Sequence, residues 1–457
     1  MATVAVTGEL ERLLGAGGVL PGDTAAYLSD ATEGRGLRGR ADAIALPAST
    51  EQVAAVVAWC YEHDVPIVPR GGGTGFAAGA VPLAGGVVLS LERLNAVRSF
   101  EPLLWRMCVE AGVRTADVRR LARENGLFFP PDPGAAEQSQ IGGNVATNAG
   151  GPHAFKYGVT GAWVTGLEAV VAPGEVVTVG GPVRKDVAGY DLRGLLVGSE
   201  GTLGVVTAVW LRLLPAPEAF LPVVAFYDGA EAGCAAIERV LGHGLPAAAL
   251  EYLDAGTIAA AGGAFPDGVP AGAGFLVAAE ADGSAAEAVR LRDELASALG
   301  EEALGLLTPR TPAEVAELWR WRDGVSIAVT AQRGGKVSED IVVPLDRLRE
   351  AVEETVAIGG RHGLEACSWG HAGDGNLHAT FLVDPRDEAE LERAEAAAGD
   401  LFELAVRLGG SVSGEHGLGW VKRGRLALQW GPAGVELHAR IKRAFDPKNL
   451  LNPGKKT

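Results

Sequence analysis

Apolar positions in the first clear stretch of the chain follow the period of a helix and then run without a break. Ser49 and Gln52 make a capping-box pattern, which predicts that a helix starts there and runs through Trp59 to His63. The apolar run Val65 to Pro69 then predicts a short buried strand, and the longer pair of runs from Leu167 to Val179 is typical of a hairpin. We therefore expect the chain to begin with a β-α-β unit.

The pattern changes after Pro215 and Pro217, where strand and helix signals alternate. In order they predict a strand at 223–227, a helix at 229–241, strands at 248–253 and 274–281, and a helix at 284–299. This order favours an antiparallel sheet with helices on one face, as in a ferredoxin-like α+β domain. We therefore expect two domains, residues 1–217 and 218–457.

Two longer helices are expected in the second half. Thr311 is a suitable N-cap for a helix that we expect to end at Trp319 to Arg322, where aromatic rings alternate with guanidinium groups. Arginines in such a pattern are commonly surface residues whose stems cover core tryptophans. The stretch Glu388 to Leu408 interleaves alanines with charges and predicts a scaffold helix.

Composition narrows the classes of function. A chain of 457 residues is long enough for two or three domains. Its net charge of -17 repels nucleic acid and anionic membrane surfaces, although small anionic substrates remain compatible with local positive groups. The four cysteines include no C-x-x-C pair, which argues against a disulfide framework and an iron–sulfur cluster. Neither a membrane-spanning run nor a signal peptide is apparent, so we expect a cytoplasmic protein.

Residues that carry chemistry cluster in two glycine-flanked stretches of the second half. HAGDGNLH at 371–378 holds two histidines without an amphipathic pattern, and SGEHG at 413–417 adds an acid and a third imidazole. Two imidazoles and a carboxylate are enough to hold a divalent metal with one position open, as in catalytic sites. The expected ligands are His371, His378 and Glu415, and His416 is left to move protons. Chance clustering in a Gly-rich chain is the alternative, but the pairing of the two stretches favours a site.

The segment Arg70 to Gly75, RGGGTG, has the composition of a phosphate-binding loop, because its backbone N–H groups can close around an anion. It also fits the dinucleotide-binding pattern G-x-G-x-x-G/A, with Glu92 about twenty residues further on. A Rossmann loop must open a helix, however, and Phe76 to Gly86 contains Pro82 and further glycines, which prevent one. By itself the loop could equally be an ordinary turn.

More loops of small residues follow in the same half and strengthen the interpretation as a ligand site. Small side chains let a planar ligand approach the backbone, and asparagines offer donors and acceptors. The loops are Pro130 to Pro133, Ile141 to Gly151, Lys185 to Asp191, and Gly198 to Gly204.

Taken in order, PRGGGTGFAAG, IGGNVATNAGG, KDVAGYDL and GSEGTLG resemble the FAD-binding half of the vanillyl-alcohol-oxidase or PCMH-type flavoproteins. HAGDGNLH, SGEHGLG and DPKNLLNPG narrow the resemblance to the D-2-hydroxy-acid dehydrogenases. That branch includes D-lactate dehydrogenases, the D subunit of glycolate oxidase and D-2-hydroxyglutarate dehydrogenase. The resemblance covers nearly the whole chain beyond residue 40. It implies an α+β fold, with a two-subdomain FAD-binding domain and a ferredoxin-like cap.

The resemblance also implies which residues contact FAD. The pyrophosphate is expected on the RGGGTG loop, the flavin against the IGGN segment, and the adenine side near GSEGT. The expected contacts are Arg70, Gly71, Gly72, Gly73, Thr74, Gly75, Pro131, Asp132, Ser139, Gly142, Gly143, Asn144, Asn148, Gly150, Glu200, Gly201, Thr202, Val205 and Asn452, the last from a tail that returns to the isoalloxazine. No histidine lies in the first loop, so we expect non-covalent FAD.

By the same resemblance, Arg322 binds the substrate carboxylate, with Ser326 and Lys336 as neighbouring contacts. A fork-shaped guanidinium suits a carboxylate held at two points. The expected reaction is hydride transfer from the α-carbon of a D-2-hydroxy acid to flavin N5. A metal, zinc with manganese or iron as alternatives, would polarise the α-hydroxyl, and His416 would take its proton.

The substrate and the electron acceptor stay open at this point. Where the hydroxyglutarate branch carries an asparagine this chain has Thr380, which favours lactate or glycolate, whereas Gln140 to Gly151 resembles the hydroxyglutarate branch. Electrons would leave to an iron–sulfur subunit, a quinone, an electron-transfer flavoprotein or oxygen. A homodimer, and attachment to the inner membrane through a partner, are further expectations. The rival functions are a non-catalytic flavin-binding subunit of a larger oxidase and a zinc hydrolase.

Overall fold

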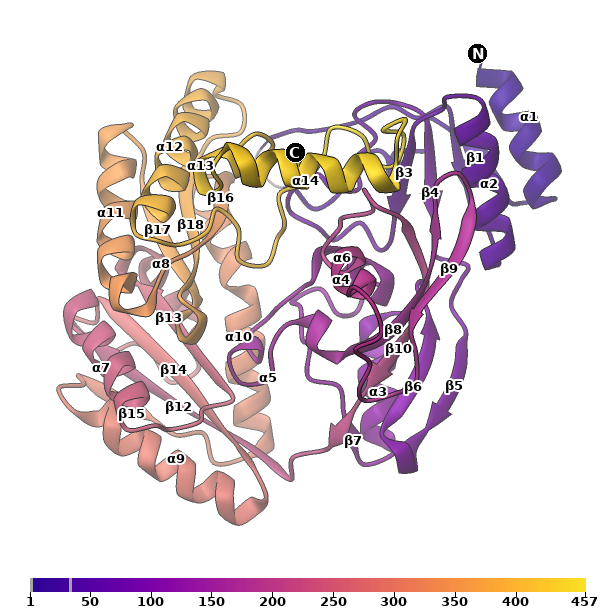
Figure 1. The fold of residues 1–457 in the computed structure, drawn as a ribbon. Coiled ribbons are helices and arrows are strands. Elements are labelled where there is room, and N and C mark those ends of the chain that lie inside the picture. The colour runs from indigo at the N-terminus through magenta and orange to yellow at the C-terminus, as the bar shows by residue number, and fades with distance from the viewer. Residues whose placement is uncertain (1–2, 33–34) are drawn as a thin grey trace.

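The computed structural model describes residues 3–32 and 35–457, which form two halves side by side (Figure 1). In the first half, one sheet has the strand order β1 (Val19–Pro21), β2 (Ala43–Ala45), β4 (Val87–Ser90), β3 (Ile67–Arg70), and β2 and β3 both run parallel to β4. A second, antiparallel sheet has the order β5 (Val97–Glu101), β6 (Arg106–Glu110), β10 (Val205–Arg212), β8 (Val164–Val171), β9 (Glu175–Gly180). The first half is therefore built from two subdomains.

Helices and a small strand pair complete the first half. The helices are α1 (Thr3–Leu14), α2 (Thr50–Glu62), α3 (Thr115–Glu124), α4 (Ile141–Thr147), α5 (Ala154–Tyr157) and α6 (Leu192–Leu196), and the pair is β7 (Leu127–Phe128) with β11 (Leu214–Pro215). No helix follows the RGGGTG loop before β4, as expected from its proline and glycines. The loop therefore runs across the end of β3 as irregular backbone.

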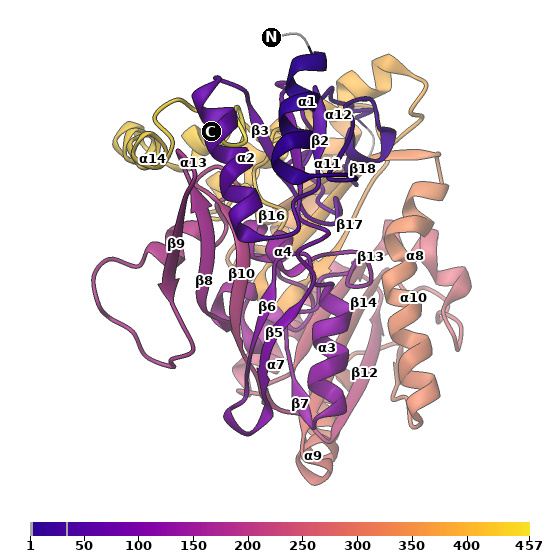
Figure 2. The same cartoon turned by 90° about the vertical axis from the view of Figure 1, so that its right-hand side faces the viewer.

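The second half is organised on one antiparallel sheet. Its strand order is β15 (Gly305–Leu307), β12 (Ala219–Tyr227), β14 (Phe275–Gly283), β13 (Ala249–Asp254), β17 (Ala366–His371), β18 (Asn376–Val383), β16 (Gly335–Val342). One face is covered by α7 (Ala230–Gly242), α9 (Ala285–Gly300), α11 (Leu348–Arg361) and α12 (Glu388–Arg407). The other carries α8 (Ala255–Ala261) and α10 (Pro312–Ala331), which stand apart from α9 in Figure 2.

Helices thus lie on both faces of this sheet, whereas the sequence pattern predicted helices on one. The reason is visible in β12, where Val223 and Ala225 face one core while Val224 and Phe226 face the other. Burying both apolar sets requires a helical layer on each side. The strands and helices expected between residues 223 and 299 are otherwise confirmed within a few residues.

Two expectations about helix ends need correction or refinement. The helix that starts at Thr311 does not stop at Trp319 to Arg322 but continues to Ala331, because Val325 and Val329 extend its buried stripe. At the predicted capping box, Ser49 accepts from the backbone N–H of Gln52, but the Gln52 side chain accepts from the N–H of Ala48 rather than Ser49. The cap is therefore present with its return bond shifted by one residue.

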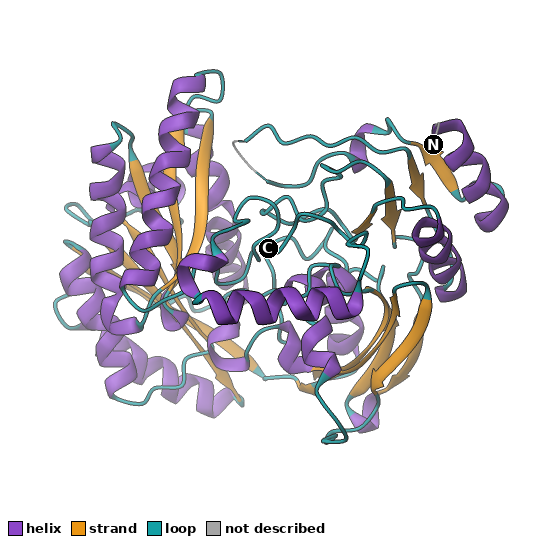
Figure 3. Cartoon of the chain, turned by 45° about the horizontal axis from the view of Figure 1, so that its top comes forward, coloured by secondary structure: helices purple, strands orange, loops and turns teal. Residues whose placement is uncertain are grey.

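The C-terminal segment ties the two halves together. Helices α13 (Leu426–Gln429) and α14 (Pro432–Phe445) lead out of the second half, and α14 lies across both halves in Figures 1 and 3. The tail then joins β3 of the first half, where the N–H of Asn452 donates to the carbonyl of Ile67 at 2.7 Å.

In the described part of the chain, no helix is both long and apolar enough to cross a membrane. The domain boundary at residue 217 stays a prediction.

Candidate functional site

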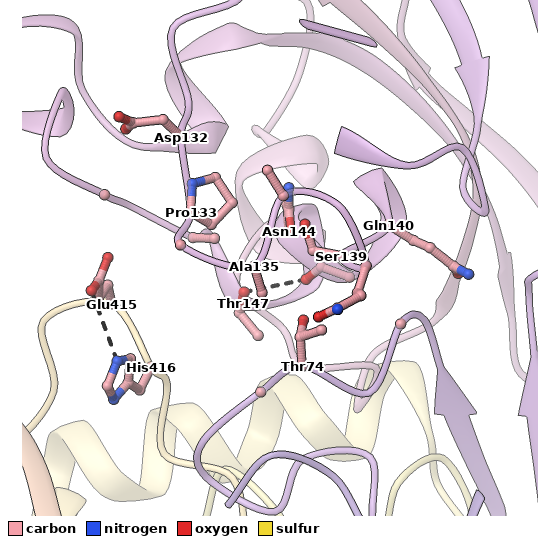
Figure 4. A pocket seen from close by; sticks show the side chains of 18 of the residues that line it. Thr74, Asp132, Pro133, Ala135, Ser139, Gln140, Asn144, Thr147, Glu415 and His416 are labelled. Atoms are coloured by element: carbon pink, nitrogen blue, oxygen red, sulfur yellow. Dashed lines mark hydrogen bonds and ion pairs between the residues drawn. The ribbon is translucent and has the colours of Figure 1, made fainter. Parts of the chain in front are cut away.

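A cavity of about 1210 Å³ lies between the two halves and is lined by both. The first half contributes residues around 70–80, 132–153 and 199–206, and the second contributes α10 and the ends of β16, β17 and β18. In Figure 4, Glu415 and His416 face Thr74, Asp132 and Pro133 across this space. The glycine-rich loops and the histidine-rich stretches of the sequence therefore meet at one cavity.

His371 and His378 stand on neighbouring strands of a tight hairpin. His371 ends β17, His378 lies in β18, and their ring centroids are 5.4 Å apart. Gly375 makes the reversal between them with φ +67°, and a Cβ there would lie 2.0 Å from the Val343 carbonyl oxygen. A Cβ on Gly373 would lie 2.4 Å from the Phe155 ring. The two glycines thus let the hairpin close and pack against the first half.

Glu415 and His416 are placed by a turn that closes around Asp340 of β16. One carboxylate oxygen of Asp340 accepts the backbone N–H groups of Gly414, Glu415 and His416 at 2.8 to 3.0 Å. The other oxygen accepts the Asn376 side chain at 2.6 Å. Burial alone would raise the Asp340 pKa, but the Lys422 ammonium and the His416 side chain, among its neighbours, hold the pKa well below its usual value. A buried carboxylate therefore anchors the turn that carries two site residues.

The predicted metal ligands form a compact donor set. Glu415 Oε1 lies 3.3 Å from His371 Nε2 and 3.7 Å from His378 Nε2. Two donors about 2.1 Å from a tetrahedral zinc ion lie about 3.4 Å apart, so these separations match the edges of such a site. His416 Nε2 lies 3.8 Å from the same oxygen, and its ring stacks on that of His378 at 5.2 Å. The arrangement fits one divalent ion with His416 beside it.

A second group of possible ligands, Asp340, His378 and His416, also lies within metal-binding separation. Asp340, however, already accepts hydrogen bonds at both of its oxygens from backbone and side-chain donors. The contacts of Glu415 Oε1 are imidazole nitrogens instead. The set containing Glu415 is therefore the better metal site.

The charges of the cluster suit a cation. Burial raises and the neighbouring His371 lowers the pKa of Glu415, which falls to about 2. Burial and the nearby His416 lower the pKa of His378 to about 3, which leaves its lone pair available near neutral pH. Burial opposes charge on His371, but the Glu251 and Glu415 carboxylates raise its pKa well above its usual value. Glu415 is thus a carboxylate and His378 a neutral imidazole near neutral pH, which are the forms that bind a cation.

The predicted substrate residues line the cavity beside this cluster. Arg322 of α10 donates through Nε and Nη2 to Glu251 Oε2 at 2.9 and 2.5 Å. Lys336 of β16 is 1% exposed, and its Nζ donates to the Ser326 hydroxyl at 2.5 Å. Two cations from different elements therefore share one wall of the cavity with the proposed metal ligands.

Most of the residues predicted to contact FAD line the cavity, but the polar groups of several of them make hydrogen bonds within the protein. Those in the lining are Arg70, Gly71, Gly72, Gly73, Thr74, Gly75, Asp132, Ser139, Gly142, Gly143, Asn144, Glu200, Gly201 and Val205, whereas Pro131, Asn148, Gly150, Thr202 and Asn452 lie outside it. The Arg70 guanidinium donates to the carbonyls of Ser29 and Ala26 at 2.8 and 2.9 Å, so it braces the loop. Glu200 accepts the N–H groups of Leu418 and Gly419 and ties the halves together.

The cavity nevertheless fits a bound dinucleotide. Gln140 Oε1 is buried and has no hydrogen-bond partner among the described residues, although Gln140 lines the cavity. A Cβ on Gly143 would meet no atom within 4 Å, so the backbone there faces open space. An unpartnered acceptor beside open backbone is what a polar planar ligand would satisfy.

Sequence reasoning missed the acids that hold the site. Glu251 and Asp340 are 0% exposed, and they stand in buried strands, β13 and β16, that each carry a second acid. Their signal was present, because a carboxylate in a buried strand needs a partner to offset its desolvation. His153 was missed too, although it joins Asp132 of the first half to Glu280 of the second.

Comparison with known families places this architecture. Residues 41–180 match the model described as FAD binding domain, and residues 216–456 match the model described as FAD linked oxidases, C-terminal domain. Among solved structures, a substrate-bound p-cresol methylhydroxylase superposes with a TM-score of 0.80 over 99% of this chain and 96% of that one, at 19% identity. At 19% sequence identity, this structural similarity supports the fold alone. The fold and the paired models define a flavin-dependent oxidoreductase.

Curated relatives span nearly the full length. Glycolate oxidase subunit GlcD of Bacillus subtilis (strain 168) is 37% identical over 91% of this chain and 88% of its own length. D-lactate dehydrogenase of Anaerostipes hadrus is 34% identical over 92% and 90%. D-2-hydroxyglutarate dehydrogenase of Xanthomonas citri pv. viticola is 35% identical over 90% and 88%. The chain belongs to the FAD-linked oxidases, in the group that contains these hydroxy-acid dehydrogenases and oxidases.

Proposed function

We propose that the protein oxidises a small D-2-hydroxy acid, D-lactate or glycolate, to the corresponding 2-oxo acid. The observation that carries the proposal is the meeting of His371, His378, Glu415 and His416 with Arg322 at one cavity. Relatives named for glycolate, D-lactate and D-2-hydroxyglutarate support this substrate class.

The chain's own residues divide the work. His371, His378 and Glu415 would hold a divalent ion, zinc with manganese or iron as alternatives, and the cavity residues of the first half would hold FAD without a covalent bond. Arg322 binds the substrate carboxylate through its guanidinium fork and so presents one face of the α-carbon. FAD held in the cavity would supply the hydride acceptor at N5, and a metal held by the three ligands would supply polarisation of the α-hydroxyl. His416 takes the proton of that hydroxyl, which an imidazole can do near neutral pH.

A second candidate substrate is D-2-hydroxyglutarate, and Lys336 is the observation that favours it. Its Nζ is buried on the cavity wall beside Ser326, and α10 carries both Ser326 and Arg322. A dicarboxylate could use Arg322 for one carboxylate and Lys336 for the other, whereas lactate has only one to offer. Lys336 is therefore the residue expected to discriminate between D-2-hydroxyglutarate and D-lactate.

The reduced flavin must pass its electrons on, and we propose a separate acceptor. The four cysteines are all buried and unpaired, and their distant positions offer no cluster site. An iron–sulfur subunit, a quinone, an electron-transfer flavoprotein and oxygen all remain suitable acceptors. A homodimer and a cytoplasmic location, with attachment to the inner membrane through a partner, complete the proposal.

The test starts with purified, FAD-loaded protein under anaerobic conditions. D-lactate, glycolate or D-2-hydroxyglutarate should bleach the flavin absorbance and L-lactate should not. A chelator should stop the bleaching, and added zinc or manganese should restore it.

A matched pair of variants locates the metal. Glu415→Gln should keep the yellow colour but lose turnover roughly 100-fold or more, since several kcal/mol of charge stabilisation are removed. Glu392→Gln, on the exposed side of α12, should behave as wild type. Full turnover in Glu415→Gln would remove the metal assignment, and a colourless protein or one reduced equally by both lactate enantiomers would refute the proposed reaction.

A further inference from the structure

Glu251 of β13 is a fully buried carboxylate behind the cavity wall, and its two oxygens serve two different residues. Oε1 lies 2.5 Å from Nδ1 of His371. Oε2 accepts from Nε and Nη2 of Arg322 at 2.9 and 2.5 Å. One side chain therefore joins a proposed metal ligand to the proposed carboxylate-binding residue.

The contact with His371 decides which ring nitrogen is available. A carboxylate accepts hydrogen bonds, so Nδ1 must carry the proton that it donates to Oε1. In the neutral ring the lone pair is then on Nε2, the atom 3.3 Å from Glu415 Oε1. Glu251 thus selects the His371 tautomer that a metal needs, with the proton on Nδ1 and the lone pair on Nε2.

The contact with Arg322 decides how the guanidinium is presented. Both hydrogen bonds to Glu251 use the edge formed by Nε and Nη2. Neither bond uses Nη1, and Arg322 is among the residues that line the cavity. Because the same carboxylate also holds His371, the separation between the carboxylate-binding end and the metal ligands is fixed through a single rigid group.

We propose that Glu251 is a positioning residue that sets both the His371 tautomer and the spacing between the metal and the substrate carboxylate. The inference rests on the proposed function of this site. It assigns Glu251 no contact with substrate. Its effect acts through its two partners, so its loss should weaken metal binding even when no substrate is present.

The sheet offers a matched control in Glu280. The pairing of Ala249 with Glu280, and of Glu251 with Ala278, places the two glutamates on the same face of neighbouring strands. Glu280 is 2% exposed and contacts His153 Nε2 and Trp319 Nε1, each at 2.7 Å. Glu280→Gln therefore removes a buried charge of the same kind without touching His371 or Arg322.

The experiment measures zinc affinity calorimetrically on FAD-loaded protein without substrate, and then KM and kcat for D-lactate. Glu251→Gln should weaken zinc binding by roughly 10- to 100-fold, the usual effect of losing such a partner, and should also raise KM. Arg322→Lys should raise KM with zinc affinity unchanged. Glu280→Gln should keep the zinc affinity of the wild type.

A second variant guards against misfolding of the first. Glu251→Asp keeps the buried charge but withdraws it by one C–C bond, about 1.5 Å, so it cannot reach both partners. It should weaken zinc binding in the same direction. Zinc affinity equal to wild type in both Glu251 variants would overturn the inference while leaving the proposed function intact. A wild-type protein that binds no divalent metal would overturn both.

Discussion

The pairing of His153 with two carboxylates predicts how stability should depend on pH. His153 Nε2 lies 2.7 Å from Glu280 Oε2 of the second half, and Nδ1 contacts Asp132 of the first half. Burial opposes the charged ring, but the Asp132 and Glu280 carboxylates raise its pKa from 6.5 to about 10. The imidazole is therefore charged at neutral pH and bridges the two halves.

The direction of the effect follows from the raised pKa. A group that binds its proton more tightly when folded stabilises the protein fully below its unfolded pKa of 6.5. That contribution is lost as the pH rises through the folded pKa of about 10. The difference between the two pKa values corresponds to at most about 5 kcal/mol. With an unfolding entropy of about 2.1 cal/mol/K per residue, 457 residues give about 1 kcal/mol/K, so the change in Tm is at most about 5 °C.

The perturbation is His153→Gln, which keeps hydrogen-bonding groups but removes the charge. Calorimetric Tm values of the FAD-loaded wild type and variant are compared from pH 6 to pH 10. The wild-type advantage should be largest near pH 6 and should shrink by up to about 5 °C toward pH 10. The control His243→Gln changes an exposed residue at the end of α7 and should leave the pH profile unchanged. A wild-type advantage that stays constant over this range would refute the reasoning.

Two further predictions concern the turn that holds the site and the choice of substrate. A Cβ on Gly414 would lie 2.4 Å from Asn376 Nδ2 and 2.7 Å from Asp340 Oδ1, so Gly414→Ala should displace the turn and weaken zinc binding with FAD content unchanged; equal zinc affinity by calorimetry would count against the turn's role. Lys336→Met should raise KM for D-2-hydroxyglutarate by roughly 10- to 100-fold, since a hydrogen bond to a charged group contributes about 1.5 to 3 kcal/mol. The KM for D-lactate should change less. Equal changes in KM for both acids would show that Lys336 does not bind the second carboxylate.

Local patterns in the sequence predicted the elements well and the assembly partly. The run Val65 to Pro69 contains most of β3 (Ile67–Arg70), and the alternation after Pro217 corresponds to strands and helices of the second half. The structure brings His371, His378 and Glu415 together. The sequence could indicate this cluster because glycine-flanked polar stretches have few structural reasons to exist in a core. Their occupation by a metal stays a prediction.

The internal use of polar groups could not be predicted from residue type. Asn144 and Asn148 were expected to offer hydrogen bonds to the cofactor, yet Asn144 donates to Thr115 Oγ1 at 2.7 Å and Asn148 accepts from Gly161 N at 2.8 Å. A sequence shows that a polar group exists but not which buried partner reaches it first. Every buried donor and acceptor needs a partner, so neighbours from distant segments compete with a ligand for the same atoms.

The strand acids show what the sequence does reveal about such competition. Glu251, Glu280 and Asp282 lie on one face of β13 and β14, and the three are 0 to 4% exposed. Their partners come from elsewhere: Arg322 and His371 for the first, His153 and Trp319 for the second, Lys156 and Tyr157 for the third. An acid in a largely apolar strand is costly to bury, so its presence marks a face that receives hydrogen-bond donors from another part of the chain. That face is here the junction of the two halves, and the proposed active site is one end of it.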